Sequence, residues 1–201
     1  MLESMTLDLT GWQEVRRDAR GIVYRDASGG AMMLSSSSVR PEIPTSFERD
    51  AWLAHARDVA RPGGIVSVDP RTIHGLPAME LIYKRQHERG FYYTGLLFME
   101  RAGNHHRVVV SWQEGPMTGA REAVLMSRLL QEGRIRLPKG RPPPGGAPLE
   151  GFVADPYDRA YTGPILRSLS DDEQYDALFP LHPLSRVRSQ LRIASETIRF
   201  S

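Results

Sequence analysis

Short runs of apolar and aromatic residues, separated by turn-forming residues, recur through the first 113 positions of the chain. Such runs, bounded by glycine, proline, asparagine or serine, are typical of β-strands. They predict strands at Trp12–Val15, Gly21–Asp26, Ala31–Ser38, Ile65–Val68, Ala78–Arg85, Phe91–Glu100 and Arg107–Gln113. Because the connections among the last four runs are short, we expect neighbouring strands to pair antiparallel.

The strand predicted at Phe91–Glu100 is apolar on both of its faces. Successive side chains of a strand point to opposite sides of the sheet. One side carries Phe91, Tyr93, Leu97 and Met99, and the other carries Tyr92, Leu96 and Phe98. Both sides of this strand therefore need a cover, and the predicted helices are the elements available to supply it.

Two longer segments carry apolar residues at helical spacing. The first is expected at Thr45–Val59, where Thr45 and Glu48 have the spacing of a capping box. The second is expected at Thr118–Glu132, with Gly133 at the position that commonly ends a helix. These patterns predict an α+β fold in which helices flank an antiparallel sheet on both faces, an α/β/α sandwich with a C-terminal helical extension.

The C-terminal extension is predicted to be helical. Ser170 and Glu173 form a second capping box for a short acidic helix, and His182 and Pro183 suit the N-cap and first turn of a final helix. The apolar stripe of that helix consists of Leu184, Val187, Leu191, Ala194 and Ile198. Burying each larger aliphatic side chain is worth about 1.5–3 kcal/mol. We therefore expect this helix to fold back on the sandwich, with its arginines facing water or a partner.

Three regions follow from this pattern. Residues 1–133 are expected to form the sandwich, and residues 170–201 are expected to form C-terminal helices that pack on it. Between them, residues 134–169 include a proline triplet and a glycine pair, which exclude regular structure and indicate a linker or a surface strap.

Composition narrows the functional classes. The chain has 201 residues, no cysteine and a formal net charge of +2. The missing thiols exclude disulfides and thiolate metal sites and favour a reducing compartment. No segment approaches the ~20 apolar residues of a membrane span, and the N-terminal residues lack the pattern of a signal peptide. The expectation is a cytoplasmic protein without a membrane span.

The segments HGLPAMELIY, GFYYTGLLF and RVVVSW, within residues 72–113, resemble the PsbP-like α/β/α sandwich superfamily. The likeness covers about residues 10–133, and the order of its elements is similar to that of the adaptor chaperones of type VI secretion. Residues 134–201 have no counterpart in this resemblance, and the signal and lipidation cysteine of the related lipoproteins are absent. Because members of the superfamily are mostly binding proteins, the resemblance implies recognition and no catalytic residues.

Histidines and serines offer weak catalytic patterns. His87, His105 and His106 lie at predicted turns, but adjacent side chains of a strand diverge and no carboxylate stands at ligand spacing. The four serines at 35–38 lack the GxSxG pattern of a nucleophile elbow. A small hydrolase or transferase that uses one of these histidines with an aspartate is the enzymatic alternative. We predict no catalytic site, no metal site and no cofactor.

Aspartates and basic residues in the last third are also better explained without a site. The aspartates Asp155, Asp158, Asp171 and Asp172 lack the spacing of a calcium loop. Basic residues of the proline-rich region, Arg134, Arg136, Lys139 and Arg141, have no aromatic residue among them for stacking on bases. We therefore predict no binding of nucleic acid.

The leading hypothesis is a non-catalytic protein-binding module, in the form of an adaptor or chaperone associated with secretion. It would hold a protein partner on one sheet face or in a groove between sheet and helix. The residues predicted to form this surface are Tyr92, Tyr93, Phe98, Met99, Trp112, Arg186, Arg188 and Arg192. The structural alternative is a homo-oligomer in which the final helix joins two subunits.

Overall fold

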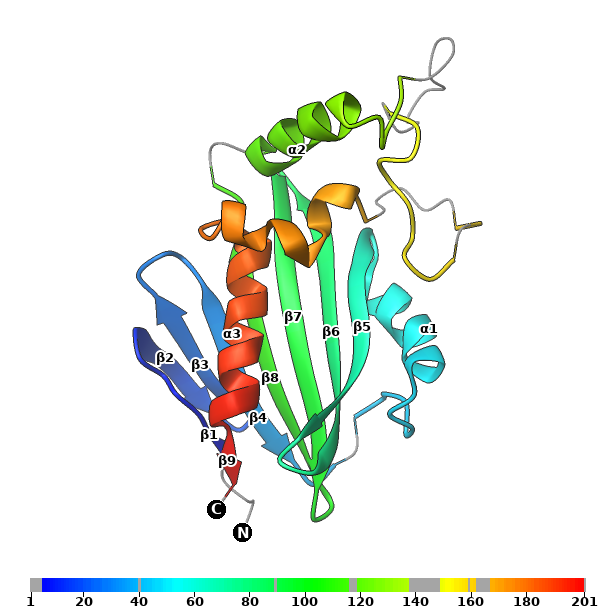
Figure 1. Cartoon of the computed structure of the whole chain (residues 1–201). Helices are drawn as coiled ribbons and strands as arrows, with labels where there is room; N and C mark the ends of the chain where they lie inside the picture. The colour runs from blue at the N-terminus through cyan, green and yellow to red at the C-terminus, as the bar shows by residue number, and fades with distance from the viewer. Residues whose placement is uncertain are drawn as a thin grey trace.

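A seven-stranded antiparallel sheet dominates the computed structural model, which describes residues 5–39, 41–88, 90–115, 119–137, 149–158, 160–161 and 167–200 (Figure 1). The strand order is β2-β3-β4-β8-β7-β6-β5, so β2 and β5 are the two edges. The strands are β2 (Trp12–Asp18), β3 (Gly21–Asp26), β4 (Ala31–Ser37), β5 (Gly63–Ile73), β6 (Leu76–His87), β7 (Gly90–Arg101) and β8 (Asn104–Gln113). A second, two-stranded sheet pairs β1 (Met5–Thr6) with β9 (Arg199–Phe200).

Helices pack on opposite faces of the large sheet. Helix α1 (Arg49–Ala60) lies beside the β5 edge and buries Trp52 and Ala56 against Met79 and Leu81 of β6 (Figure 1). Helix α3 (Pro183–Thr197) crosses β7 and β8 on the other face. Its stripe, predicted from the spacing, is buried against the sheet: Leu184, Val187, Leu191, Ala194 and Ile198 are each at most 1% exposed. The predicted fold class is therefore confirmed.

The predicted faces of the Phe91–Glu100 strand are also confirmed. Tyr93, Leu97 and Met99 belong to the cluster under α3, whereas Phe98 belongs to the cluster under α1. Phe98 packs between Trp52 and Phe47, with ring centroids 5.5 Å and 5.8 Å away. Each face of β7 thus contributes to a separate apolar core.

Helix starts differ from the prediction where a capping box was expected. Helix α1 begins at Arg49, and its N-cap Glu48 makes no side-chain cap; the Glu48 amide donates instead to Ser46 Oγ. The second box is formed by Ser168 and Asp171, and the segment holds two 3₁₀ helices, η1 (Leu169–Asp171) and η2 (Glu173–Leu178), instead of one α-helix. Both predicted boxes were therefore misplaced: Ser46 takes the place of Thr45 at the Glu48 amide, and the second box lies two residues earlier than predicted.

The start of α3 agrees with the sequence. His182 is the N-cap, and its Nδ1 accepts a hydrogen bond of 3.2 Å from the Leu184 amide. Pro183 follows at the first helical position, where its missing N–H costs nothing. Among the described residues, no helix is long and apolar enough to cross a membrane.

Helix α2 (Ala120–Gln131) lies across one end of the sheet (Figure 1). It packs on η1, and its Leu129 forms a small apolar cluster with Ile135, Leu149 and Phe152. The cover of the second sheet face is therefore α3, from the C-terminal part of the chain. The predicted division at residues 133 and 169 stays a prediction.

A buried ionic cluster joins these C-terminal elements to the sheet. Lys84 of β6 is 2% exposed, and its Nζ lies 2.8 Å from Asp171 Oδ2 and 3.8 Å from Glu122 Oε1. Arg121 of α2, also buried, lies 2.8 Å from Asp176 and donates to the carbonyls of Ser170 and Asp172. Burial opposes the charge on Asp171, but Lys84, the Ser168 amide and Arg121 outweigh it and hold the pKa of Asp171 below its ordinary value.

Candidate binding surfaces

Four residues predicted to contact a partner lie in the core. Tyr93, Phe98, Met99 and Trp112 are 1%, 2%, 0% and 5% exposed. They fill the spaces under α1 and α3, because the strands that carry them run through the middle of the sheet. In this structure they are core residues, and the surface predicted from them is not available to a partner.

The remaining predicted residues reach the surface. Tyr92 is half-buried on the α1 side of the sheet, where its hydroxyl lies 3.2 Å from Ser111 Oγ. Arg186 is half-buried on α3. Arg188 and Arg192 line a groove beside α3, where Arg188 pairs with Asp176 and Arg192 pairs with Glu173. These residues occupy two different faces of the molecule, so they do not form one surface.

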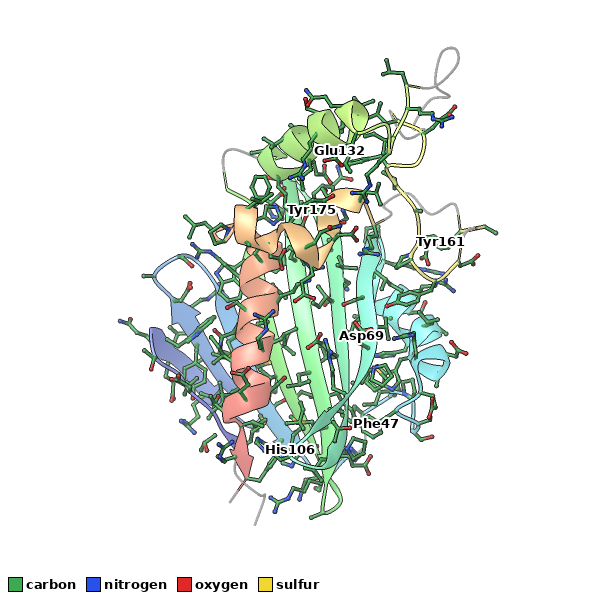
Figure 2. The ribbon with its side chains drawn as sticks, viewed as in Figure 1. Phe47, Asp69, His106, Glu132, Tyr161 and Tyr175 are labelled. Carbon is green, nitrogen blue, oxygen red and sulfur yellow. The ribbon has the colours of Figure 1, made fainter. Side chains whose placement is uncertain are left out.

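The histidines of the enzymatic alternative do not converge. His87 pairs with the exposed Gln113, whereas His105 and His106 are buried on opposite faces of β8. His106 lies at one end of the sheet (Figure 2) and is fully buried; its Nδ1 is 2.8 Å from Ser36 Oγ, and its ring centroid is 4.7 Å from that of Phe200. No group of three His, Cys, Asp or Glu that could hold a metal exists among the described residues.

The aspartates and the basic region have structural contacts. Asp155 and Asp158 lie near Arg57, and Asp172 pairs with Arg167. Asp171 pairs with Lys84, as given above. Arg134 donates to the Tyr175 hydroxyl, and the backbone of Arg136 bridges to Glu150. Lys139 and Arg141 lie outside the described residues.

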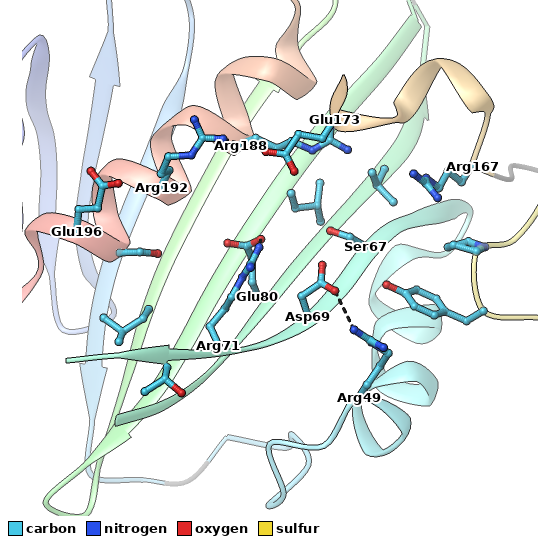
Figure 3. Close-up of a pocket in the computed structure, with 17 residues that line it drawn as sticks. Arg49, Ser67, Asp69, Arg71, Glu80, Arg167, Glu173, Arg188, Arg192 and Glu196 are labelled. Atoms are coloured by element: carbon cyan, nitrogen blue, oxygen red, sulfur yellow. Dashed lines mark hydrogen bonds and ion pairs between the residues drawn. The ribbon is translucent and has the colours of Figure 1, made fainter. Parts of the chain in front are cut away.

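A groove of about 670 Å³ lies between α3 and the strands β5 and β6 (Figure 3). Helix α3 packs on β7 and β8, so the same face of β5 and β6 is left open beside it. Five arginines and four carboxylates line the groove: Arg49, Arg71, Arg167, Arg188, Arg192, Asp69, Glu80, Glu173 and Glu196. Its apolar lining comes from Val66, Ile73 and Ile82. We call this site the charged groove.

Ion pairs hold most of the charges of this groove in place. Arg49 lies 3.1 Å from Asp69, and Arg71 lies 2.9 Å from Glu80, whose side chain is only 11% exposed. The hydrogen bond that Arg71 donates to Glu80 raises the pKa of Arg71 above its ordinary value. Asp69 and Glu80 thus already accept hydrogen bonds from arginines of the groove. The described lining residues therefore suit recognition of a ligand better than acid-base chemistry.

A second open surface lies on the α1 side of the sheet. In the strand register, Val23, Met33, Val109 and Leu96 stand side by side across β3, β4, β8 and β7. The row continues into Leu81 and Val68, which are buried beneath α1. Because α1 packs on β5 and β6, the first four side chains are left half-buried. We call these four residues the apolar row.

Polar and basic side chains flank the apolar row. Tyr92, Thr94 and Ser111 lie on the same face toward one end of the strands. Arg25 is exposed on β3, and Arg107 on β8 donates from Nε to Ser35 Oγ at 3.2 Å. Neither arginine forms an ion pair with another described residue. The surroundings of the row therefore favour negative charge.

Sequence reasoning named only Arg188 and Arg192 of the charged groove and none of the apolar row, although part of the signal for the groove was present. On the α3 side of β6, Glu80 lines the groove and Lys84 lies in the buried ionic cluster, charged positions where a sandwich strand should be apolar. Such positions indicate either a buried pair or a site. The apolar row had no such signal, because its residues come from four runs whose register is decided by pairing.

Comparisons with known proteins assign no family to the chain. No family model and no curated protein matches it. Three solved structures are similar: PA94, a Pseudomonas aeruginosa protein of unknown function (14% identity, 70% of this chain and 85% of that chain, TM-score 0.34), a Bacteroides thetaiotaomicron VPI-5482 protein (11%, 61% and 46%, 0.36), and the cyanobacterial PsbP, CyanoP, of Synechocystis sp. PCC 6803 (11%, 65% and 88%, 0.37). At such low identities and TM-scores these likenesses assign no function, and the fold class rests on the sheet and helices themselves.

Proposed function

We propose that this chain is a non-catalytic protein-binding module, a cytoplasmic adaptor or chaperone, that holds an apolar segment of a partner against the apolar row. The observation that carries the proposal is the row itself: Val23, Met33, Val109 and Leu96 are aligned across four strands, and helix α1 stops short of them. When a partner excludes water from a sheet face left half-covered in this way, the free energy falls, which favours binding.

The dimensions of the row suit a helix of the partner. Four neighbouring strands span roughly 14 Å, from a spacing of about 4.8 Å between strands. Apolar side chains at positions i, i+4, i+7 and i+11 of a helix span about 16 Å. Arg25 and Arg107 stand beside the row and form no ion pair with described residues, so acidic residues flanking the apolar stripe would complement them. The proposed partner segment is an acidic amphipathic helix.

Photocrosslinking in cells tests this proposal. A photoreactive phenylalanine replaces Gln13, an exposed residue opposite Arg25 in the strand register, or Val124 of α2, which is 56% exposed and serves as the matched control position. We expect one reproducible protein adduct from position 13 and none from position 124. The crosslinked peptide should be apolar with acidic neighbours.

A second variant links the adduct to the row. Met33→Glu places a negative charge among the apolar side chains, which should weaken an acidic partner at least about tenfold, because it adds both desolvation and repulsion. Val15→Glu changes an exposed valine on β2, outside the row, and should leave the adduct intact. An adduct that survives Met33→Glu, a crosslink to lipid or to a second copy of this chain, or no adduct at all would contradict the proposal.

A further inference from the structure

We infer that the charged groove is a second binding site, independent of the apolar row, that takes an extended peptide with a basic side chain at one end and an acidic side chain at the other. The groove and the row lie on opposite faces of the sheet, because Glu80 and Ile82 face the α3 side whereas Met79 and Leu81 face α1. The two sites can therefore be occupied and tested separately.

The walls of the groove are built from regular elements, so the charges stand at defined positions. On α3, Arg188, Arg192 and Ser195 follow the spacing of one helix face. On β5, Asp69, Arg71 and Ile73 are alternate residues and therefore point to the same side. A ligand lying between these walls would meet a preformed surface, which lowers the entropic cost of binding.

The ion pair of Arg71 and Glu80 adds little to the stability of the sheet. Glu80 and Arg71 occupy a place beside the apolar core of the sheet, where Ile82 and Val66 are 1% and 2% exposed. An ion pair in such a position gives little net stability, and apolar side chains of similar volume often do as well or better. Charged pairs at the floor of an open groove are instead well suited to exchange hydrogen bonds with a polar ligand.

The two ends of the groove differ in the polar groups that remain for a ligand. Glu196 lies at one end and forms no ion pair with another described residue, whereas Arg49 and Arg167 lie at the other (Figure 3). Arg167 pairs with Asp172, but its Nε is buried without a hydrogen-bond partner among the described residues. Arg49 uses Nε on the Val68 carbonyl and Nη2 on Asp69, which leaves further N–H donors of its guanidinium. This polarity fixes the direction of a ligand with two opposite charges.

The length of the site sets the size of that ligand. Arg188 and Glu196 are eight residues apart on α3, a distance of about 12 Å along the helix axis. Arg167 lies beyond Arg188 as seen from Glu196 (Figure 3), and an extended chain advances about 3.3 Å per residue, so at least roughly four residues separate the two ends. The ligand class is therefore a peptide with a basic and an acidic residue at least about four positions apart.

Selection of random peptides against the full-length protein tests the inference. Phage-displayed dodecapeptides are enriched on wild-type protein and, in parallel, on the Glu196→Lys variant. Glu196 is exposed and unpaired among described residues, so this change should not disturb folding. We expect wild-type protein to enrich peptides with one basic and one acidic residue at the stated spacing. Glu196→Lys should replace the basic preference by an acidic one.

Affinity measurements complete the test. A fluorescent peptide with the enriched sequence should bind Glu196→Lys at least about tenfold more weakly than wild type. Its affinity for the wild-type protein should fall as added salt screens the charges. Met33→Glu, on the opposite face, should leave this affinity unchanged. Enrichment of apolar or singly charged peptides, no enrichment, or a preference that Glu196→Lys does not alter would overturn the inference, whatever the fate of the proposal for the apolar row.

Discussion

Gly95 on β7 allows α3 to approach the sheet closely. A Cβ at this position would lie 2.6 Å from Leu191 Cδ1 and 2.7 Å from Val187 Cγ1, closer than side-chain atoms can pack. Glycine is therefore needed at position 95 because it has no side chain, and not because it allows an unusual backbone conformation. The helix and strand meet directly because one residue has no side chain.

Gly95→Ala is accordingly expected to push α3 away from β7 and lower the free energy of unfolding by about 1–3 kcal/mol, the usual cost of overpacking a core. Urea denaturation followed by tryptophan fluorescence measures it. Gly115→Ala is the matched control, because an added Cβ there would meet no atom within 4 Å. Equal midpoints for the two variants would show that α3 does not pack on β7 as described.

Lys84 and Asp171 form a buried pair, so removing one partner strands the other charge away from water. Lys84→Met is expected to lower the free energy of unfolding by about 3–5 kcal/mol. Arg128→Met breaks the ion pair with Glu132 on the exposed side of α2 and should leave the midpoint unchanged. Comparable urea midpoints for Lys84→Met and wild type would contradict the role assigned to this pair.

The lowered pKa of Asp171 also predicts how the stability of the fold depends on pH. Its pKa is lower in the folded chain than in the unfolded chain, so the pair stabilises the fold fully above the ordinary carboxyl pKa of 3.8 and loses this contribution as pH falls through the depressed value. Asp171→Asn cannot titrate, although it keeps an oxygen for the Ser168 amide. Denaturation between pH 6 and about 3 should therefore show a smaller fall for Asp171→Asn than for wild type. Parallel curves would exclude Asp171 as a source of acid sensitivity.

Strand β5 is an edge whose backbone is blocked by side chains. The Val68 amide donates to the Tyr157 hydroxyl at 2.6 Å, and that hydroxyl and Arg49 Nε both donate to the Val68 carbonyl. Pro70, two residues later, has no N–H to offer. Side chains and proline that occupy an edge in this way prevent pairing with another chain. The two binding surfaces therefore use sheet faces, while this edge is closed.

Tyr157→Phe removes both hydrogen bonds of the hydroxyl and is expected to cost about 0.5–1.5 kcal/mol for each bond lost. The sharper measurement is hydrogen exchange at the Val68 amide, which should become faster than in wild type because water reaches it. Amides of β8, in the middle of the sheet, should change little. Unaltered exchange at Val68 would mean that Tyr157 does not cap the edge.

At the scale of the whole molecule, helix α3 is part of the sandwich, because its apolar residues cover one face of the sheet. Leu184, Val187 and Leu191 share one cluster with Met32 of β4 and Val108 of β8. Contacts at the C-terminal end of α3 add to this packing: β9 pairs with β1, and the Thr197 hydroxyl accepts a hydrogen bond from the Asp8 amide. The two ends of the described chain are therefore held together on one side of the sheet (Figure 1).

A chain that ends at Leu178 is consequently expected to lose cooperative unfolding, because the α3 face of the sheet would be exposed to water. Thermal unfolding by circular dichroism, together with light scattering, distinguishes a folded from an aggregated truncation. Full-length Leu181→Asp, which changes a residue that is 74% exposed, should unfold as wild type does. A cooperative transition in the truncated chain would show that α3 is dispensable for the sandwich.

The sequence alone predicted the elements with strong local patterns. The strand at Phe91–Glu100, with its two apolar faces, and the stripe of the last helix were predictable because each repeat follows from the geometry of its own backbone. His182 and Pro183 could be assigned to a helix start for the same reason, since capping involves only neighbouring residues. The fold class followed from the order of these elements.

Only the tertiary structure decided which helix covers which face and which residues remain exposed. Tyr93 and Trp112 look like binding residues in the sequence, and packing under α3 buries them. The charged groove joins residues from Arg49 to Glu196, and the apolar row joins four strands through their register. Local periodicity cannot determine such contacts, because they depend on the pairing and packing of segments far apart along the chain.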